Sequence, residues 1–244
     1  MKRAFADLHL RLNPKDTATA QRVIAKTAQL GYGLVAVSFA SETGEAEIAN
    51  FRSICTKAEV DFASRVDLIP KTRNQLMFLL RKLRRKFEVV SVDCENKEVA
   101  RQAAKDRRVD LLNFPSLDYR GRFFDWAEAE LASNSLAALE VDAKPLLLLE
   151  GSARVRLLST LRREVSIARE YHVPVVVSSG VGTEILLRKP RELAAFASLF
   201  GLDEVSALNA VSLNPWTIVL RNREKLRRGF VAPGIRVVKE GRDC

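Results

Sequence analysis

Short apolar runs alternate with longer amphipathic stretches along the chain. Several of the apolar runs, such as LVAVSF, VDLLNF and PVVVS, are almost continuous in apolar residues. Continuous apolar character is typical of parallel strands that are buried on both faces. The pattern therefore predicts strands at Ala4–Leu8, Leu34–Phe39, Phe62–Ile69, Phe87–Val92, Val109–Phe114, Ala137–Val141 and Pro174–Ser178.

The longer stretches between these runs have the helical period. Asp16 and Thr17 can cap a helix that runs to Leu30, and Gly31 then ends it. From Thr72 onwards, leucines recur on one helical face while basic residues point the other way. Further helices are expected from Ser152 to about Tyr171, from Pro190 to Gly201, at Asp203–Val211 and at Pro215–Asn222, with a late strand at Gly234–Val238.

The spacing of the strands points to one fold class. The predicted strands begin roughly 25–35 residues apart, which is the length of a strand–helix unit. Seven such units in a chain of 244 residues predict a single-domain α/β fold, a TIM-like (β/α) barrel with extra C-terminal helices. An open doubly wound sheet is the alternative, because no clear eighth strand follows Leu199. We find no linker, so residues 1–244 are expected to form one domain with a basic C-terminal extension from about residue 221.

The charge balance adds a class of partner to this picture. The chain has 40 Lys or Arg against 30 Asp or Glu, a formal net charge of +10. A surface this basic attracts polyanions, usually nucleic acid, although the same charge also serves solubility. The chain has no apolar run of membrane-spanning length and no signal-peptide core, so we expect a soluble, cytoplasmic protein. Three scattered cysteines encode neither a disulfide framework nor a zinc knuckle.

Functional side chains of such a barrel stand at the carboxyl ends of the strands. Asp7 and His9 are two residues apart, so they are expected to share one face of the first strand at the barrel mouth. Only one other histidine, His172, is present, and a hydrolytic cluster needs more ligands, so we expect no bound metal. A hydrogen-bonded plug and a contact with RNA both stay open for this pair. Other polar residues at strand ends are Ser38, Arg65, Asp67, Asp93, Asn113, Asp142 and Ser178–Gly180.

Arginines at the same end of the barrel are candidates for binding RNA phosphates. Arg120 and Arg122 follow the fifth strand in the run YRGRFF, which combines cations with aromatic rings that can stack on bases. Arg188 lies just before a helix start, where phosphate binding is favoured. Arg65, at the end of the third strand, is a further candidate. The alternative for Arg120 and Arg122 is a loop that packs on its own aromatic rings. The alternative for Arg188 is a solvated turn.

Two other segments have weaker signals for phosphate binding. Ser178 and Ser179, followed by Gly180, could cradle a phosphate with backbone N–H groups, but the run is not a P-loop. The run RKLRRK at residues 81–86 is expected to be a solvated helix face, with RNA contact as the alternative.

Four segments of the chain resemble protein component 3 of archaeal ribonuclease P. They are FADLHLRLNP, VARQAAKDRRVDLLNFPS, VPVVVSSGVGTEILLRKPRELAAFASLFGL and DEVSALNAVSLNPWTIVLRN, in the order and spacing of that family. The family in turn resembles the barrel superfamily of polymerase-associated and histidinol phosphatases. That superfamily opens with His-x-His, where this chain has Asp7–Leu8–His9, and the later histidines are missing here.

The resemblance implies a protein subunit of ribonuclease P that supports the catalytic RNA while the complex removes the 5′ leader of precursor transfer RNA. It implies RNase P RNA and other protein subunits as partners, precursor tRNA as an indirect one, no cofactor on this chain and magnesium on the RNA. Arg101, Arg188, Ser178 and Ser179 match family motif positions and are expected to contact RNA. Two alternatives stay open: a free-standing metal-dependent phosphoesterase, and a barrel that binds only proteins.

Overall fold

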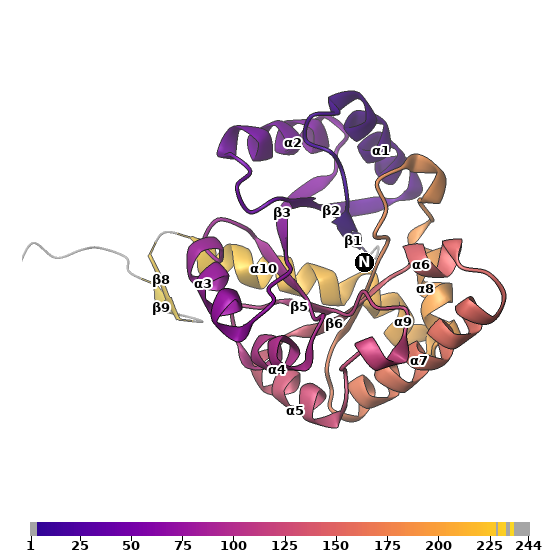
Figure 1. Cartoon of the computed structure of the whole chain (residues 1–244). Helices are drawn as coiled ribbons and strands as arrows, with labels where there is room; N and C mark the ends of the chain where they lie inside the picture. Colours follow the sequence, from indigo (N-terminus) through magenta and orange to yellow (C-terminus); the bar gives the residue numbers. More distant parts are fainter. Residues whose placement is uncertain (1–3, 228, 233–234, 237–244) are drawn as a thin grey trace, which may run out of the picture.

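The computed structural model describes residues 4–227, 229–232 and 235–236 of the chain. Seven parallel strands form one sheet in sequence order, with helices around its outside (Figure 1). The strands are β1 (Phe5–Leu10), β2 (Tyr32–Phe39), β3 (Asp61–Leu68), β4 (Val89–Asp93), β5 (Leu111–Asn113), β6 (Ala138–Asp142) and β7 (Val175–Ser178). The predicted TIM-like barrel is therefore confirmed, and each predicted strand lies within a few residues of an observed one.

Helices follow the strands and cover the outer face of the sheet (Figure 1). They are α1 (Thr17–Leu30), α2 (Glu45–Lys57), α3 (Arg73–Leu83), α4 (Lys97–Lys105), α5 (Trp126–Ser135), α6 (Lys144–Leu148), α7 (Gly151–Glu170), α8 (Pro190–Leu199), α9 (Glu204–Ala210) and α10 (Leu213–Leu226), with short 3₁₀ turns η1 (Tyr119–Gly121) and η2 (Glu184–Leu186). Asp16 caps α1 by accepting from the Thr19 N–H, and Gly31 ends it in the left-handed conformation, as the sequence predicts. Within the described residues, no helix has the length and apolar character needed to cross a membrane.

Within the described part of the chain, the barrel sheet has seven strands and closes without an eighth. At the carboxyl ends of the strands, β1 meets the segment after β7: Arg11 N–H donates to Val181 O at 2.9 Å, and Gly180 N–H donates to His9 O at 3.0 Å. Lower down, Ala6 N–H donates to Val211 O at 2.9 Å, between α9 and α10. The α9–α10 junction thus provides a backbone partner for β1 where an eighth strand would pair.

The floor of the barrel is closed by α10, which crosses beneath the strands (Figure 1). Small and branched side chains fill the inside of the barrel, and Ile218 and Val219 of α10 pack against them from below. The second and larger apolar core lies between the sheet and the surrounding helices. The polar side chains at the carboxyl ends of the strands are therefore held over a closed, packed interior.

The basic extension predicted from residue 221 is partly wrong. Residues 221–226 belong to α10, where Asn222 is buried and Arg223 pairs with Asp61 at 2.6 Å and with Glu88 at 2.7 Å. Beyond the helix, β8 (Phe230–Ala232) pairs antiparallel with β9 (Ile235–Arg236), inside the late strand predicted at Gly234–Val238. The other residues of that predicted strand lie outside the described ones.

Candidate functional site

The centre of the barrel mouth is occupied by a guanidinium group. Arg65, near the end of β3, is 0% exposed. Its two terminal nitrogens donate to the two oxygens of Glu140 at 2.5 and 2.6 Å, and its Nε donates to Asp67 Oδ1 at 2.7 Å. A fourth bond runs from Nη1 to the backbone oxygen of Leu8 at 2.8 Å. Because a buried guanidinium cannot reach an RNA phosphate, the prediction that Arg65 binds RNA is wrong.

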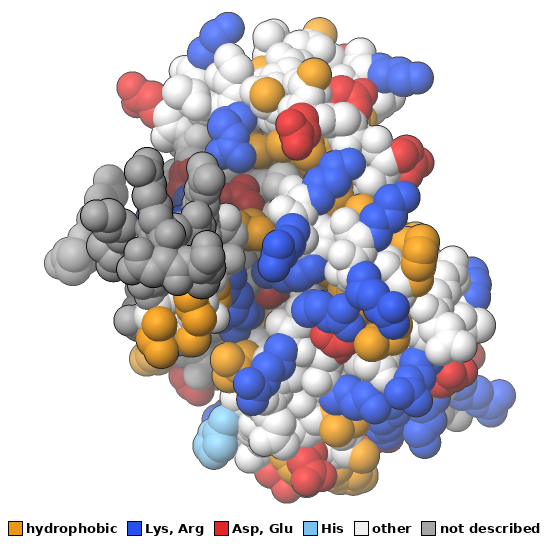
Figure 2. Space-filling model, turned by 90° about the vertical axis from the view of Figure 1, so that its left-hand side faces the viewer, with side chains coloured by type: hydrophobic (Ala, Val, Ile, Leu, Met, Phe, Trp, Pro, Cys, Tyr) orange, Lys and Arg blue, Asp and Glu red, His pale blue; other side chains and the backbone are white. Residues whose placement is uncertain are grey.

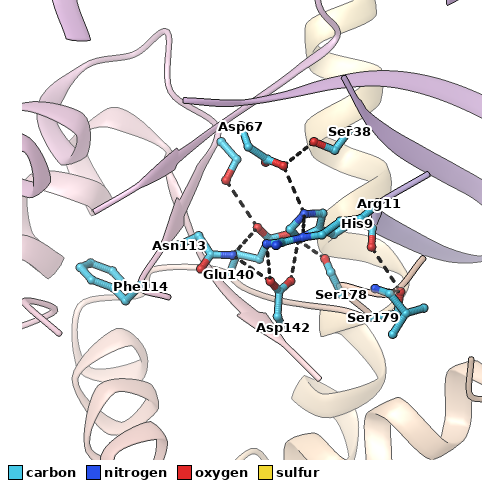
Figure 3. Close-up of polar contacts among 12 residues, drawn as sticks. His9, Arg11, Ser38, Asp67, Asn113, Phe114, Glu140, Asp142, Ser178 and Ser179 are labelled. Atoms are coloured by element: carbon cyan, nitrogen blue, oxygen red, sulfur yellow. Dashed lines mark hydrogen bonds and ion pairs between the residues drawn. The ribbon is translucent and has the colours of Figure 1, made fainter. Parts of the chain in front are cut away.

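His9 lies next to this group and faces two carboxylates (Figure 3). Its Nδ1 lies 2.8 Å from Asp142 Oδ1, and its Nε2 lies 3.2 Å from Asp67 Oδ2. Burial and the charge of Arg65 oppose protonation, but Asp142 and Asp67 outweigh them and raise the pKa of His9 to about 10. Arg11 Nε also lies 2.9 Å from Nε2.

Asp7 belongs to the closure of the barrel rather than to this ion-pair cluster. Its Oδ1 accepts from the backbone N–H of Ser179 at 3.0 Å and of His9 at 3.1 Å, and burial raises its pKa. Gly180 follows with a φ of +68°, and a side chain there would meet Asp142 within 2.9 Å. Ser178 and Ser179 are buried, and the N–H groups of Ser179 and Gly180 are already hydrogen-bonded. The predicted phosphate cradle and RNA contact at these serines are therefore wrong.

Asp93, like Asp7, has a buried carboxylate oxygen that accepts no hydrogen bond within the described residues. In Asp93 this oxygen is Oδ1. Burial and then the charge of Asp67 raise the pKa of Asp93 to about 7. The Asp67 carboxylate behaves in the opposite way: although burial opposes ionisation, Arg65 and His9 hold its pKa well below the usual range. Ser38 also donates to Asp67.

The donor groups of the mouth do not fit a divalent metal ion. His9, Glu140 and Asp142 lie close enough for each to offer one ligand atom. However, both Glu140 oxygens accept from Arg65, and Asp142 accepts from Asn113 at 3.3 Å and faces His9. The Arg65 guanidinium already supplies the positive charge that a metal would bring to these carboxylates.

The loop after β5 is folded back onto the protein. Arg122 is 7% exposed, and its guanidinium forms a two-pronged ion pair with Glu164 of α7 at 2.8 and 2.6 Å. It also donates to Phe114 O, while Phe114 and the buried Phe124 pack edge to face at 5.9 Å. The interpretation of this loop as one packed on its own aromatics is confirmed for these residues, and the prediction that Arg122 binds RNA is wrong.

Three of the predicted RNA contacts are not buried. Arg120 lies at the surface, and Arg188 is half-buried, with its guanidinium donating to Leu187 O at 2.9 Å and to Ile185 O at 3.0 Å. Arg101 joins α4 to α5 through Asp125 at 2.6 Å and Glu128 at 2.7 Å. Contacts between these three arginines and RNA stay predictions.

Sequence reasoning missed the acidic partners of the two buried arginines. Glu140 stands in the apolar strand ALEVD, and Glu164 lies on the inner face of α7. A glutamate in the middle of a buried strand is itself a signal, because a buried carboxylate needs a cationic partner. Which arginine pairs with it depends on strand order and register, which a single sequence does not display.

The fold and the mouth define a class: a closed parallel α/β barrel whose polar end is filled by internal ion pairs. The chain matches the model of the family described as RNase P subunit p30 over residues 4–227. It therefore belongs to the RNase P subunit p30 family. It is 31% identical over 241 residues to ribonuclease P protein component 3 of Methanosarcina barkeri, covering 98% of both chains, and 30% identical to that of Methanosarcina mazei, covering 99% of this chain and 98% of the relative.

Solved structures share the fold. A chain in the cryo-EM structure of archaeal ribonuclease P with mature tRNA superposes with a TM-score of 0.82 at 22% identity, covering 98% of this chain and 100% of that one. A Xaa-Pro dipeptidase with methionine in its active site superposes with a TM-score of 0.60 at 10% identity, covering 91% of this chain and 76% of that one. At these identities the likeness shows the barrel and nothing of its chemistry.

Proposed function

We propose that the chain is a protein subunit of ribonuclease P that supports the catalytic RNA in removing the 5′ leader of precursor transfer RNA. The observation that carries the proposal is the match to the RNase P subunit p30 family over nearly the whole chain, together with full-length relatives named ribonuclease P protein component 3. A cytoplasmic location follows from this function as an expectation.

The barrel mouth favours a supporting role over catalysis by the chain itself. A hydrolytic site needs an open coordination position or a free base that can reach a substrate. Here Arg65, Glu140 and His9 are 0–1% exposed and bonded to one another or to their neighbours. The free-standing phosphoesterase therefore remains the weaker alternative, and the catalyst of the complex is the RNA with its own magnesium.

The partners in this proposal are the ribonuclease P RNA, precursor tRNA indirectly, and other protein subunits of the enzyme. Family membership supports an assembly of this kind. Apolar side chains on several helices are exposed, including Trp126 of α5 at 58% and Val155 of α7 at 65%, and exposed apolar side chains are common at protein contacts.

Affinity purification of the tagged full-length chain from its native cells tests the proposal. RNA sequencing and mass spectrometry of the eluate are expected to recover the ribonuclease P RNA together with other ribonuclease P proteins. A tagged, unrelated barrel protein of similar charge serves as the control. Recovery of neither partner above that control would contradict the proposed function.

A further inference from the structure

The positive charge of the chain is concentrated in two segments of the sequence. Residues 71–108 contain 12 Lys or Arg and five Asp or Glu. Residues 221–244 contain eight Lys or Arg and three Asp or Glu. The rest of the chain has 20 Lys or Arg against 22 Asp or Glu, so it is slightly acidic. The excess charge therefore belongs to the segment from α3 to the end of α4 and to the C-terminal segment that begins within α10.

The outer face of α3 combines this charge with an aromatic ring. Phe78, Arg81, Lys82 and Arg85 follow the helical period on the exposed side of the helix and the turn after it. Phe78 is 62% exposed. Arg81 and Arg85 have no hydrogen bond or ion pair within the described residues, so their charges are free to meet a ligand.

The C-terminal end of α3 and the last turns of α10 meet at one buried carboxylate. Asp110 lies 3.5 Å from Arg84 and 3.2 Å from Arg221, which ties α3 to α10. Lys105 and Arg107 are exposed at and just beyond the C-terminal end of α4, which packs beside α3. Lys225 lies one helical turn after Arg221 on α10. Figure 2, which looks onto the α3 side of the molecule, shows Lys and Arg side chains gathered over this face.

We propose that the surface formed by Arg81, Lys82, Arg85, Lys105, Arg107 and Lys225, here named the basic flank, is where the chain binds the phosphate backbone of RNA. This inference rests on the proposed function, because the polyanion is taken to be the ribonuclease P RNA. It places the RNA on the outside of α3 and α4, near the floor of the barrel. The sequence alone favoured the rim at the opposite end.

Charge and composition favour RNA over an acidic protein as the occupant. Phosphates are best met by cations that have no internal partner, and an exposed ring among them can stack on an unpaired base. The acidic residues of the same segment are mostly engaged: Glu88 pairs with Arg223, Glu95 with Lys71 and Asp106 with Arg108. The rim offers less, since Arg65 and Arg122 are buried in ion pairs.

Three full-length variants test the basic flank against matched alternatives. The flank variant is Arg81→Ala, Lys82→Ala and Arg85→Ala. The control variant, Lys26→Ala, Arg163→Ala and Arg191→Ala, removes the same charge and residue types from exposed positions on α1, α7 and α8. The rim variant is Arg120→Ala with Arg188→Ala. Circular dichroism and thermal melting establish that each variant is folded, as expected for positions that are exposed or, for Arg188, half-buried.

Binding of the in vitro transcribed ribonuclease P RNA is measured across a salt series. The flank variant is expected to bind about tenfold or more weakly at about 0.15 M salt, with its log–log salt slope reduced by about 2. The control and rim variants are expected to change the slope by less than about 1. Phe78→Ala is expected to weaken binding severalfold without changing the slope, because stacking releases no counterions.

Several outcomes would overturn the inference. Equal losses of RNA affinity in the flank and control variants would mean that only the net charge of the chain matters. A larger loss of RNA affinity in the rim variant would place the RNA at the mouth. A flank variant that binds RNA normally but no longer co-purifies with the other protein subunits would assign the surface to a protein. If the wild-type chain binds no ribonuclease P RNA either alone or in the assembled complex, the proposed function fails and not merely this surface.

Discussion

At the scale of single residues, Arg65 holds two carboxylates that would otherwise be buried without a counter-charge. Glu140 is 1% exposed, and the side chain of Asp67 is 16% exposed. Removing one partner of a buried pair leaves an uncompensated charge and typically costs 3–5 kcal/mol. We therefore expect Arg65→Met to lower the free energy of unfolding by about 3–5 kcal/mol, measured by urea titration.

Arg81→Met is the matched control for this substitution, because Arg81 is exposed and has no internal partner within the described residues. It is expected to change stability by no more than about 0.5 kcal/mol. Combining Arg65→Met with Glu140→Gln removes the unpaired charge and should recover part of the lost free energy of unfolding. Equal, small effects of Arg65→Met and Arg81→Met would contradict the role given to the buried guanidinium.

The charge of His9 makes a second prediction at this scale. Because its folded pKa of about 10 lies above the ordinary value of 6.5, protonated His9 stabilises the fold at neutral pH. That contribution is complete below the ordinary value and is lost as pH rises towards about 10. Nitrogen NMR of a His172→Gln variant, in which His9 is the only histidine, should show an imidazolium at pH 8.

Asp142→Asn supplies the test of cause for His9, since it removes one of the two carboxylates that face the ring. The pKa of His9 should be clearly lower in this variant than in the protein with Asp142 intact. Deprotonation of His9 near its ordinary pKa in both proteins would show that the ion pairs of the mouth do not control it.

At the scale of secondary-structure elements, α10 closes the floor of the barrel, while the α9–α10 junction pairs with β1. Ile218 is 4% exposed and packs against the small residues inside the sheet. Truncating such a side chain leaves a cavity that the rigid barrel cannot fill, so Ile218→Ala is expected to cost about 2–4 kcal/mol. Leu220→Ala, at a position that is 55% exposed on the same helix, should cost much less, and equal costs would argue against α10 as the floor.

The repeating units of the fold were predictable from the sequence, whereas the closure of the barrel was not. Apolar runs and caps such as Asp16 and Gly31 are local signals, so strands and helices could be placed within a few residues. The hydrogen bond between Ala6 and Val211 connects segments that are about 200 residues apart in the chain. Because it is a bond between backbone groups, the pattern of side chains does not predict it.

The same limit explains which site residues were predicted correctly. The positions at strand ends were right, since Asp67, Asn113 and Asp142 all lie at the mouth. Whether an arginine there faces solvent depends on its acidic neighbours in space. Arg65 and Arg122 pair with Glu140 and Glu164, 75 and 42 residues further along the chain, so their burial was invisible in the sequence.

At the scale of the whole molecule, the two ends of the barrel have different chemistry. The mouth is neutralised internally by ion pairs, and the apolar floor is covered by α10, with the basic flank beside it. The RNA-binding surface that we propose therefore lies on the outside of the helices. This arrangement is the one expected of the proposed role in supporting a folded RNA.

Reconstituted cleavage of precursor tRNA tests this account most directly. The chain alone, with or without added divalent metal, should release no 5′ leader. A mixture of the ribonuclease P RNA and the other protein subunits should cleave faster when the chain is added, and His9→Ala that remains folded should support the same rate as the wild type. Metal-dependent cleavage by the chain alone that disappears in His9→Ala would contradict the account.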